Sequence, residues 1–299
     1  MPESPLSASA YEVLGVGPSV TQDALRKAFR KALRDTHPDT GGDPKRFTAV
    51  QRAWEQVGTP EARAAYDAGR GATAGFTAKP AQARKASRPA ARSYGHPGGW
   101  RRERYLELVR EWVGRGVAIA DPYDPALVRS APREIRHTLA DALAEESTAR
   151  TLSALGIGYT VWHDVSTGAP ALKIDHVVLG PTGLFAMLSE DFGGPVRVRR
   201  GDLIGDGVDR PMHELGLRAK ALARQVRIKF TALVIVLPDD SLDEPVAQLG
   251  SVRGAAAVAV RQSTLSTLLR SGIAGAPVIG GNELFDVRTR IQSGVRLIQ

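Results

Sequence analysis

The 299-residue chain contains no cysteine. This absence excludes disulfide bonds, thiolate zinc sites and cysteine nucleophiles, and it fits a reducing compartment. Long apolar runs are missing too: stretches such as 231–237 have the length of a strand and fall well short of the ~20 apolar residues of a membrane helix. No basic segment followed by an apolar run indicates a signal peptide. We therefore expect a soluble, cytoplasmic protein, and the 42% hydrophobic content is enough for a folded core.

The net charge of +8 is concentrated in one short segment. Residues 71–104 contain eight Lys or Arg and a single acidic residue, Glu103. Residues 1–70 contain ten basic and nine acidic residues, and residues 105–299 contain 22 of each. Neither of the two longer parts is therefore basic overall, which argues against a large nucleic-acid-binding surface on either of them.

Residues 71–100 are rich in Ala, Gly, Pro and Arg and show almost no apolar periodicity. Such a stretch buries too little surface to offset its ordering entropy, so we predict a disordered linker between domains at 1–70 and 101–299. We favour a solubilising spacer over a weak, salt-sensitive contact with nucleic acid. The basic residues available for that contact are Lys79, Arg84, Lys85, Arg88 and Arg92.

The first domain has the pattern of an antiparallel helical hairpin. Thr21 is a suitable N-cap for a helix that ends at the Pro- and Gly-containing run 36–42, and a second long helix begins near Pro44. The two helices carry apolar stripes, made of Leu25, Phe29 and Leu33 and of Phe47, Val50, Trp54 and Val57. These stripes can bury each other, and Pro60 opens a further short helix.

The second domain alternates between helical and strand-like segments. We expect helices at 101–115, 132–155 and 212–229, and strands at 159–165, 171–179, 183–189, 196–199, 231–237 and 255–260. Hairpins followed by a helix–strand crossover predict an α/β domain with a mixed sheet flanked by helices.

The first domain contains three characteristic segments: YEVLGV at 11–16, LRKAFRKALRDTHPD at 25–39 and FTAVQRAWEQVGTPEARAAYD at 47–67. With these segments it resembles the J-domain (DnaJ-like) family over residues 10–70. It implies a co-chaperone that binds a DnaK-type ATP-dependent chaperone and stimulates its ATP hydrolysis. The family's docking face falls on Arg26, Lys27, Arg30, Lys31 and Arg34, and its stimulating loop falls on His37, Pro38 and Asp39.

The chemistry of these residues suits those roles. Exposed basic side chains speed encounter with an acidic partner, Pro38 stiffens the turn, and Asp39 can accept charge-assisted hydrogen bonds. Taken alone, a basic helical face is more often merely solvated. Because the chain has neither a cysteine-rich module nor a long Gly/Phe-rich segment, we expect an adaptor that serves an unidentified client protein.

The second domain contains Glu145-Glu146 in its leading helix, TVWHDV at 160–165 and IDHVVLGPTGLF at 174–185. With these segments it resembles the nuclease-related domain (NERD) of the restriction-endonuclease-like, PD-(D/E)xK fold over residues 135–260. The family's metal-dependent nuclease site would consist of Asp175 and a Glu-x-Lys triplet at 188–190. This chain has Leu188, Ser189 and Glu190 there, so we expect an inactive, vestigial site at Glu146, Asp175, Leu188 and Glu190.

Alternatives remain open for the second domain. The two-residue period of a strand places Lys173 on the face of Asp175 and Glu190 on that of Leu188, which would allow a migrated nuclease site. Asp175 and Glu146 are equally compatible with structural pairing to an arginine, and we interpret His163 and His176 as structural. We expect no cofactor, no metal and no enzymatic activity. The alternative is a metal-dependent nuclease or a nucleic-acid-binding protein that carries a J domain.

Overall fold

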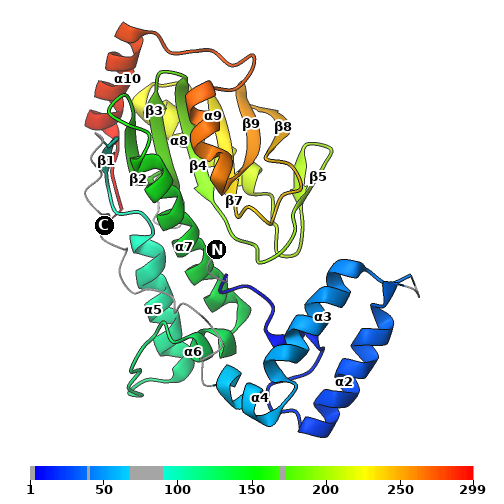
Figure 1. The fold of residues 1–299 in the computed structure, drawn as a ribbon. Helices are drawn as coiled ribbons and strands as arrows, with labels where there is room; N and C mark the ends of the chain where they lie inside the picture. Colours follow the sequence, from blue (N-terminus) through cyan, green and yellow to red (C-terminus); the bar gives the residue numbers. More distant parts are fainter. Residues whose placement is uncertain (1–3, 39–40, 68–89, 169–172, 299) are drawn as a thin grey trace. The chain divides into compact units, whose positions relative to one another are not determined.

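The computed structural model describes residues 4–38, 41–67, 90–168 and 173–298 (Figure 1). They belong to two compact units, which are described separately. The first comprises Met1–Lys79 with Trp112–Arg136, and the second comprises Pro80–Glu111 with His137–Gln299. Among the described residues, no helix combines the length and the apolar character that crossing a membrane requires.

The first unit is helical, and its hairpin is confirmed. Its helices are α1 (Ala10–Val13), α2 (Gln22–Asp35), α3 (Pro44–Val57), α4 (Pro60–Asp67) and α6 (Pro125–Ser130). Helices α2 and α3 lie side by side (Figure 1). The predicted N-cap is in place, because the Thr21 hydroxyl accepts a hydrogen bond from the amide of Ala24. Asp43 caps α3, which has a proline at its first position.

The two predicted stripes meet in the core of this unit. Leu25 and Val57 are fully buried, and the rings of Phe29 and Trp54 stack with their centroids 4.3 Å apart. Arg63 of α4 holds the segment before α2 by donating hydrogen bonds to the carbonyls of Pro18 and Val20 and to the Tyr11 hydroxyl.

Helix α6 was not predicted, because its six residues are too few for a recognisable period. It packs against α4 through Arg129, which donates to the carbonyl of Tyr66 at 3.0 Å and lies over the Tyr66 ring. Nearby, Arg136 donates to the Glu12 carboxylate at 3.1 Å. The first unit therefore extends beyond the hairpin to include part of the chain between residues 112 and 136.

The second unit contains a seven-stranded mixed sheet in the order β1-β2-β3-β4-β7-β9-β8. Its strands are β1 (Arg92–Tyr94), β2 (Thr160–Ser166), β3 (Lys173–Gly180), β4 (Gly183–Ser189), β7 (Ala232–Leu237), β8 (Val246–Val252) and β9 (Ala255–Arg261). The pairs β2–β3, β3–β4 and β8–β9 are antiparallel, whereas β1–β2, β4–β7 and β7–β9 are parallel. A separate hairpin joins β5 (Arg197–Arg199) to β6 (Asp202–Ile204).

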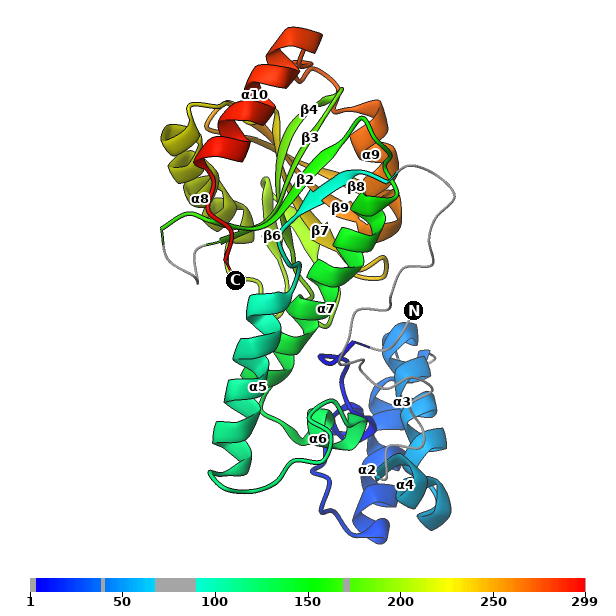
Figure 2. The ribbon, with the colours of Figure 1, turned by 90° about the vertical axis from the view of Figure 1, so that its left-hand side faces the viewer.

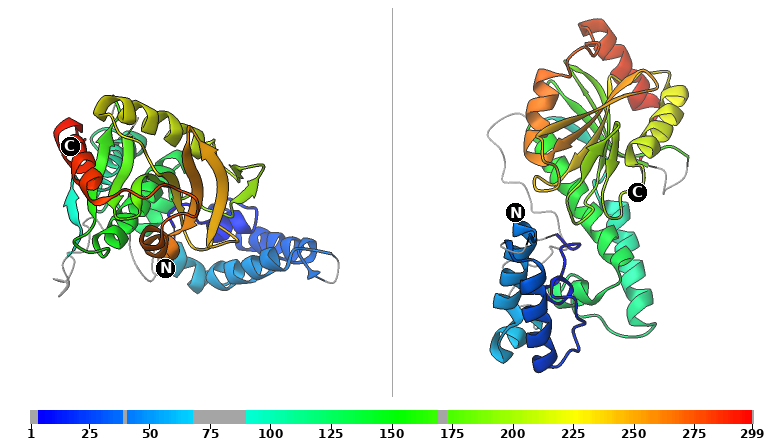
Figure 3. Two further views of the ribbon diagram at one scale, coloured as in Figure 1. Left: turned by 90° about the horizontal axis from the view of Figure 1, so that it is seen from above. Right: turned by 90° about the vertical axis from the view of Figure 1, so that its right-hand side faces the viewer.

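Helices cover both faces of this sheet (Figures 2 and 3). One face packs against α8 (Pro211–Val226) and α10 (Gly281–Gly294), and the other packs against α7 (Arg133–Ser153) and α9 (Leu265–Ser271). Helix α5 (Gly99–Val113) runs beside α7. Strand β7 is buried along its whole length, as expected for a central parallel strand. The predicted mixed α/β architecture is thus confirmed.

The predicted disordered linker is wrong at its C-terminal end. Residues 92–94 form β1, which pairs in parallel with β2, and the Arg92 amide donates to the Tyr159 carbonyl at 3.1 Å. Composition could not predict this, because β1 is held by backbone bonds to an existing sheet edge and has no apolar pattern of its own. Residues 71–89, with four of the five basic side chains of the segment, lie outside the described part. Strands β6 and β8 and helices α9 and α10 were also missed.

The hairpin between β3 and β4 depends on Gly183. Its φ is +142°, and a Cβ there would lie 2.3 Å from Oγ1 of Thr231. We expect Gly183→Ala to destabilise the protein by about 2–4 kcal/mol, because strain and overlap act together. Gly194→Ala is the matched control, since no atom lies within 4 Å of a Cβ at that position. Urea unfolding measures both, and equal stability of the two variants would contradict this account.

Candidate functional site

The loop after α2 is closed by backbone hydrogen bonds and one close approach. The amide of Gly42 donates to the His37 carbonyl at 2.9 Å, and that of Gly41 donates to the Pro38 carbonyl at 3.0 Å. A Cβ on Gly42 would lie 2.2 Å from the Thr36 carbonyl carbon, so only glycine fits there. The His37 ring meets Phe47 of α3 edge-on, with the centroids 5.1 Å apart. Asp39 lies outside the described residues.

Helix α2 presents a continuous basic surface beside this loop. The five basic residues predicted for a docking face are all exposed: Arg26, Lys27, Arg30, Lys31 and Arg34. The opposite side of the helix holds Leu25, which is buried in the core of the hairpin. The helix therefore separates a packing side from a charged side that is open to a partner.

The second unit contains a buried cluster of ionisable side chains centred on Lys173. Its ammonium lies 2.6 Å from Glu145, 2.6 Å from Asp164 and 2.8 Å from Asp175. All four side chains are at most 2% exposed. Lys173 is the first residue of β3. Its ammonium lies between the Glu145 carboxylate of α7 and the carboxylates of Asp164 and Asp175 in the sheet.

A second cation, Arg101 of α5, extends the cluster. Its guanidinium contacts Glu145, lies 2.5 Å from Asp141 and approaches Glu190 to 3.7 Å. Two cations are thus shared by five carboxylates, and we call these seven residues the ion cluster. Its members are Arg101, Asp141, Glu145, Asp164, Lys173, Asp175 and Glu190.

A left-handed backbone conformation distinguishes the position of Asp164 on β2. Its φ is +51°, and neither Asp164 nor Asp175 opposite it is among the paired residues, although the register is the same on both sides, from His163↔His176 to Val165↔Ile174. Aspartate tolerates this left-handed conformation better than most residues. The Asp164 carboxylate accepts a hydrogen bond from the Lys173 ammonium at 2.6 Å.

The residues that the sequence predicted for a nuclease site are only partly brought together. Lys173 and Asp175 meet, as their shared strand face predicts, and the second Asp175 oxygen accepts a hydrogen bond from the Ser189 amide at 2.9 Å. The residue of the leading helix that joins them is Glu145. Glu146, which was expected there, instead forms a bidentate pair with Arg102 at 2.6 and 2.9 Å.

The side chains of Leu188 and Glu190 have different surroundings. Leu188 packs in the apolar core that contains α8 and α10. Strand β4 ends at Ser189, so Glu190 leaves the two-residue period and faces Arg101 instead of sharing the face of Leu188. The predicted common face of Leu188 and Glu190 is therefore wrong.

His163 and His176 form a buried pair on neighbouring strands. Their Nδ1 atoms lie 2.7 Å apart, and Nε2 of His163 lies 2.8 Å from the Ser93 hydroxyl on β1. Burial lowers the pKa of His163 to about 4 and that of His176 as well. The neutral rings link β1, β2 and β3, which fits the structural role expected for them.

Charge is unevenly distributed over the ion cluster. Burial raises the pKa of Glu145 to about 8, of Glu190 to about 8 and of Asp141 to about 6. Although burial opposes it, the neighbouring Lys173 and Arg101 lower the pKa of Asp175 to about 2. Asp175 therefore carries the most firmly held negative charge, and Glu145 and Glu190 are the carboxyls that take up protons first.

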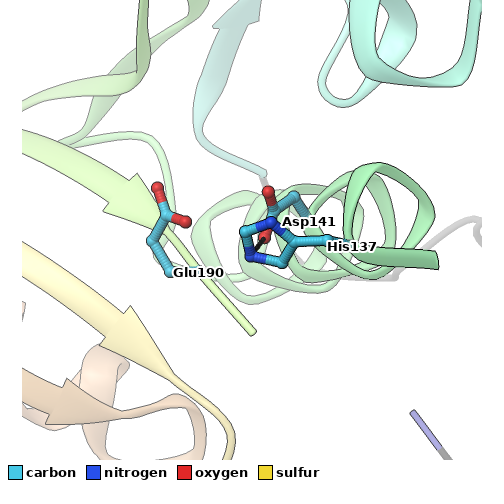
Figure 4. A group of neighbouring side chains, drawn as sticks. All are labelled: His137, Asp141 and Glu190. Atoms are coloured by element: carbon cyan, nitrogen blue, oxygen red, sulfur yellow. Dashed lines mark ion pairs between the residues drawn. The ribbon is translucent and has the colours of Figure 1, made fainter. Parts of the chain in front are cut away.

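One grouping was missed by the sequence analysis. His137 and Asp141 lie one helical turn apart on α7 and, with Glu190, place one ligand atom each within 4.8 Å of one another (Figure 4). The i, i+4 spacing of His137 and Asp141 was visible in the sequence, but the third member lies about 50 residues further along the chain.

The ion cluster predicts how stability depends on pH. Glu145 and Glu190 have folded-state pKa values raised above the ordinary 4.5, so their neutral forms add stability that is fully present below about pH 4.5 and is lost as the pH rises through about 8. The lowered pKa values of His163 and His176 act in the opposite direction, because these rings add stability as the pH rises toward 6.5. We therefore expect the free energy of unfolding to fall between about pH 6.5 and 8 in EDTA-containing buffer, as measured by urea titration. Glu145→Gln and Glu190→Gln should flatten the fall.

Glu111→Gln is the control for these two variants, because Glu111 is exposed on α5 and stands outside the ion cluster. It should retain the wild-type slope. A wild-type profile that is flat or rises over this interval would contradict the assignment.

Comparison with known proteins identifies the first unit. The family model of the DnaJ domain matches residues 9–67. A DnaJ protein homolog of Cucumis sativus is 49% identical over 57 residues, which are 19% of this chain and 14% of that protein. Chaperone protein DnaJ 2 of Streptomyces avermitilis is 42% identical over 62 residues, which are 20% of this chain and 16% of that protein.

The chain thus covers only a small part of these relatives, and the similarity is confined to the helical hairpin and its flanks. No solved structure matches. The matched segment contains α1 to α4, the exposed basic face and the closed loop at His37 and Pro38. Residues 9–67 of this chain are therefore a J domain.

Proposed function

We propose that this protein is a co-chaperone that docks on a DnaK-type chaperone and stimulates its ATP hydrolysis. The observation that carries the proposal is the placement of His37 and Pro38 directly after a helix whose five basic residues are all exposed. Arg26, Lys27, Arg30, Lys31 and Arg34 offer positive charge to an acidic surface, and this attraction weakens as salt is added.

The loop is suited to act once the helix has docked. Its backbone is closed by the Gly41 and Gly42 hydrogen bonds, and Phe47 supports the His37 ring, so His37 is presented in one orientation. A preorganised loop loses little entropy on binding. His37 serves here as a shaped hydrogen-bonding group, and no proton-transfer step is required of it.

The test is the rate of ATP hydrolysis by a DnaK-type chaperone mixed with the full-length protein. We expect His37→Gln to reduce the stimulated rate to the unstimulated one while circular dichroism remains that of the wild type. His213→Gln is the matched control, since His213 is exposed on α8 and far from the J domain in sequence. Absence of stimulation by the wild-type protein would overturn the proposal.

We further propose that the second unit is a restriction-endonuclease-like, nuclease-related module that has lost catalysis and binds a client or partner protein. Two observations support this. Leu188 occupies a position where the family needs a metal-binding carboxylate, and it is packed in the core. Lys173 and Asp175 are at most 2% exposed, so a phosphodiester has no route to them.

The alternative is a metal-dependent nuclease or a nucleic-acid-binding protein with a J domain, and one observation supports it. The Lys173 ammonium contacts the carboxylates of Asp175 and Glu145, so a lysine and two carboxylates lie together although residues 188–190 lack the Glu-x-Lys sequence. Burial weighs against this alternative. Of the five basic linker residues that would contact nucleic acid, four lie outside the described residues and only Arg92 lies within them.

A cleavage assay distinguishes the proposed non-catalytic binding module from the nuclease alternative. We expect no cleavage of single- or double-stranded DNA or RNA by the full-length protein with Mg²⁺ or Mn²⁺, because the ion cluster excludes substrate. Metal-dependent cleavage that disappears in Asp175→Ala would establish the nuclease instead. Glu111→Gln, on the exposed side of α5, is the control for contaminating activity.

A further inference from the structure

Three side chains at the edge of the ion cluster have ligand chemistry that the proposed function does not use. His137 and Asp141 come from one side of α7, and Glu190 follows the last residue of β4 (Figure 4). An imidazole nitrogen and two carboxylate oxygens from these residues lie within 4.8 Å of one another. Helix α7 and the segment after β4 thus bring together one nitrogen donor and two oxygen donors.

The two carboxylate oxygens of Asp141 contact different neighbours. Oδ2 lies 2.5 Å from Arg101, whereas Oδ1 lies 3.6 Å from Nε2 of His137 and accepts a hydrogen bond from the amide of Asp191. Arg101 also approaches one oxygen of Glu190. Arg101 therefore pairs with the Asp141 oxygen that does not face His137, as outer-sphere groups do around metal ligands, and it also lies close to Glu190.

The group is enclosed but reachable. Asp141 is 2% exposed and Glu190 is 12% exposed, whereas the His137 side chain is 37% exposed with its Nε2 atom buried. An ion can enter past His137 and then be shielded from water by the protein. In this respect the group differs from Lys173 and Asp175, which have no exposed edge.

Charge also favours a cation at this position. The ion cluster holds five carboxylates against two cations, Lys173 and Arg101. Uncompensated charge in a protein interior is costly, and it must be met by protons or by a cation. A divalent ion beside Asp141 and Glu190 would meet this excess of negative charge in place of protons.

We propose that His137, Asp141 and Glu190 bind a divalent first-row transition ion, with Zn²⁺ as the preferred metal. Mg²⁺ and Ca²⁺ favour all-oxygen sites, whereas an imidazole nitrogen combined with carboxylates suits Zn²⁺. The ion joins α7 to the end of β4. The inference goes beyond the proposed function, because neither ATPase stimulation nor client binding requires a metal, and either can fail without the other.

The test is a titration of chelator-stripped, untagged full-length protein with Zn²⁺ in competition with a chromophoric chelator. We expect one tightly bound Zn²⁺ per chain. His137→Gln and Glu190→Gln should each weaken binding by at least about tenfold, the range seen when a metal site is disturbed. His213→Gln, which removes an exposed histidine of α8, should bind as the wild type does, and Mg²⁺ at the same concentration should not compete.

A thermal melt accompanies each titration. Zn²⁺ should raise the melting temperature of the wild-type protein and of His213→Gln but not that of the two ligand variants. If the wild type binds no Zn²⁺, or if His137→Gln and Glu190→Gln bind it as tightly as the wild type, the proposal is wrong. Should Glu190→Gln fail to fold, His137→Gln decides the matter, because His137 lies at the exposed edge.

Discussion

The second unit depends on how a few buried cations are shared among a larger number of carboxylates. Lys173 contacts three acidic side chains, and Arg101 connects one of them to two more. Removing either cation would leave ionised carboxylates in a medium that solvates them poorly, at a cost of several kcal/mol. The helices α5 and α7 and the strands β2 and β3 are held in place by these shared contacts as well as by the apolar cores on the two sides of the sheet.

The same burial supports our proposal that the second unit has no nuclease activity. A metal-dependent nuclease needs its lysine and carboxylates at a surface that a phosphodiester can reach. Here Lys173 and Asp175 are satisfied by each other and by Glu145, and Leu188 completes the neighbouring core. The carboxylates that remain near the surface, Asp141 and Glu190, belong to the group for which we propose a metal.

The J domain is organised differently. Its core consists of the two apolar stripes together with residues in and next to α1, and the five basic residues of α2 are exposed. Gly42 lies after α2 where any side chain would collide with Thr36, and Phe47 of α3 contacts the His37 ring. The co-chaperone function that we propose therefore rests on exposed charge and on the placement of His37.

The sequence by itself determined the J domain, since a helical period, an N-cap at Thr21 and the order of residues around His37 are local properties. It also predicted most strands and the shared strand face of Lys173 and Asp175, because a strand's alternation is local too. Only the tertiary structure decided that Glu145 joins the ion cluster in place of Glu146, that residues 92–94 extend the sheet, and that Glu190 meets Asp141. Each of these depends on contacts between segments distant in the chain, which no local period encodes.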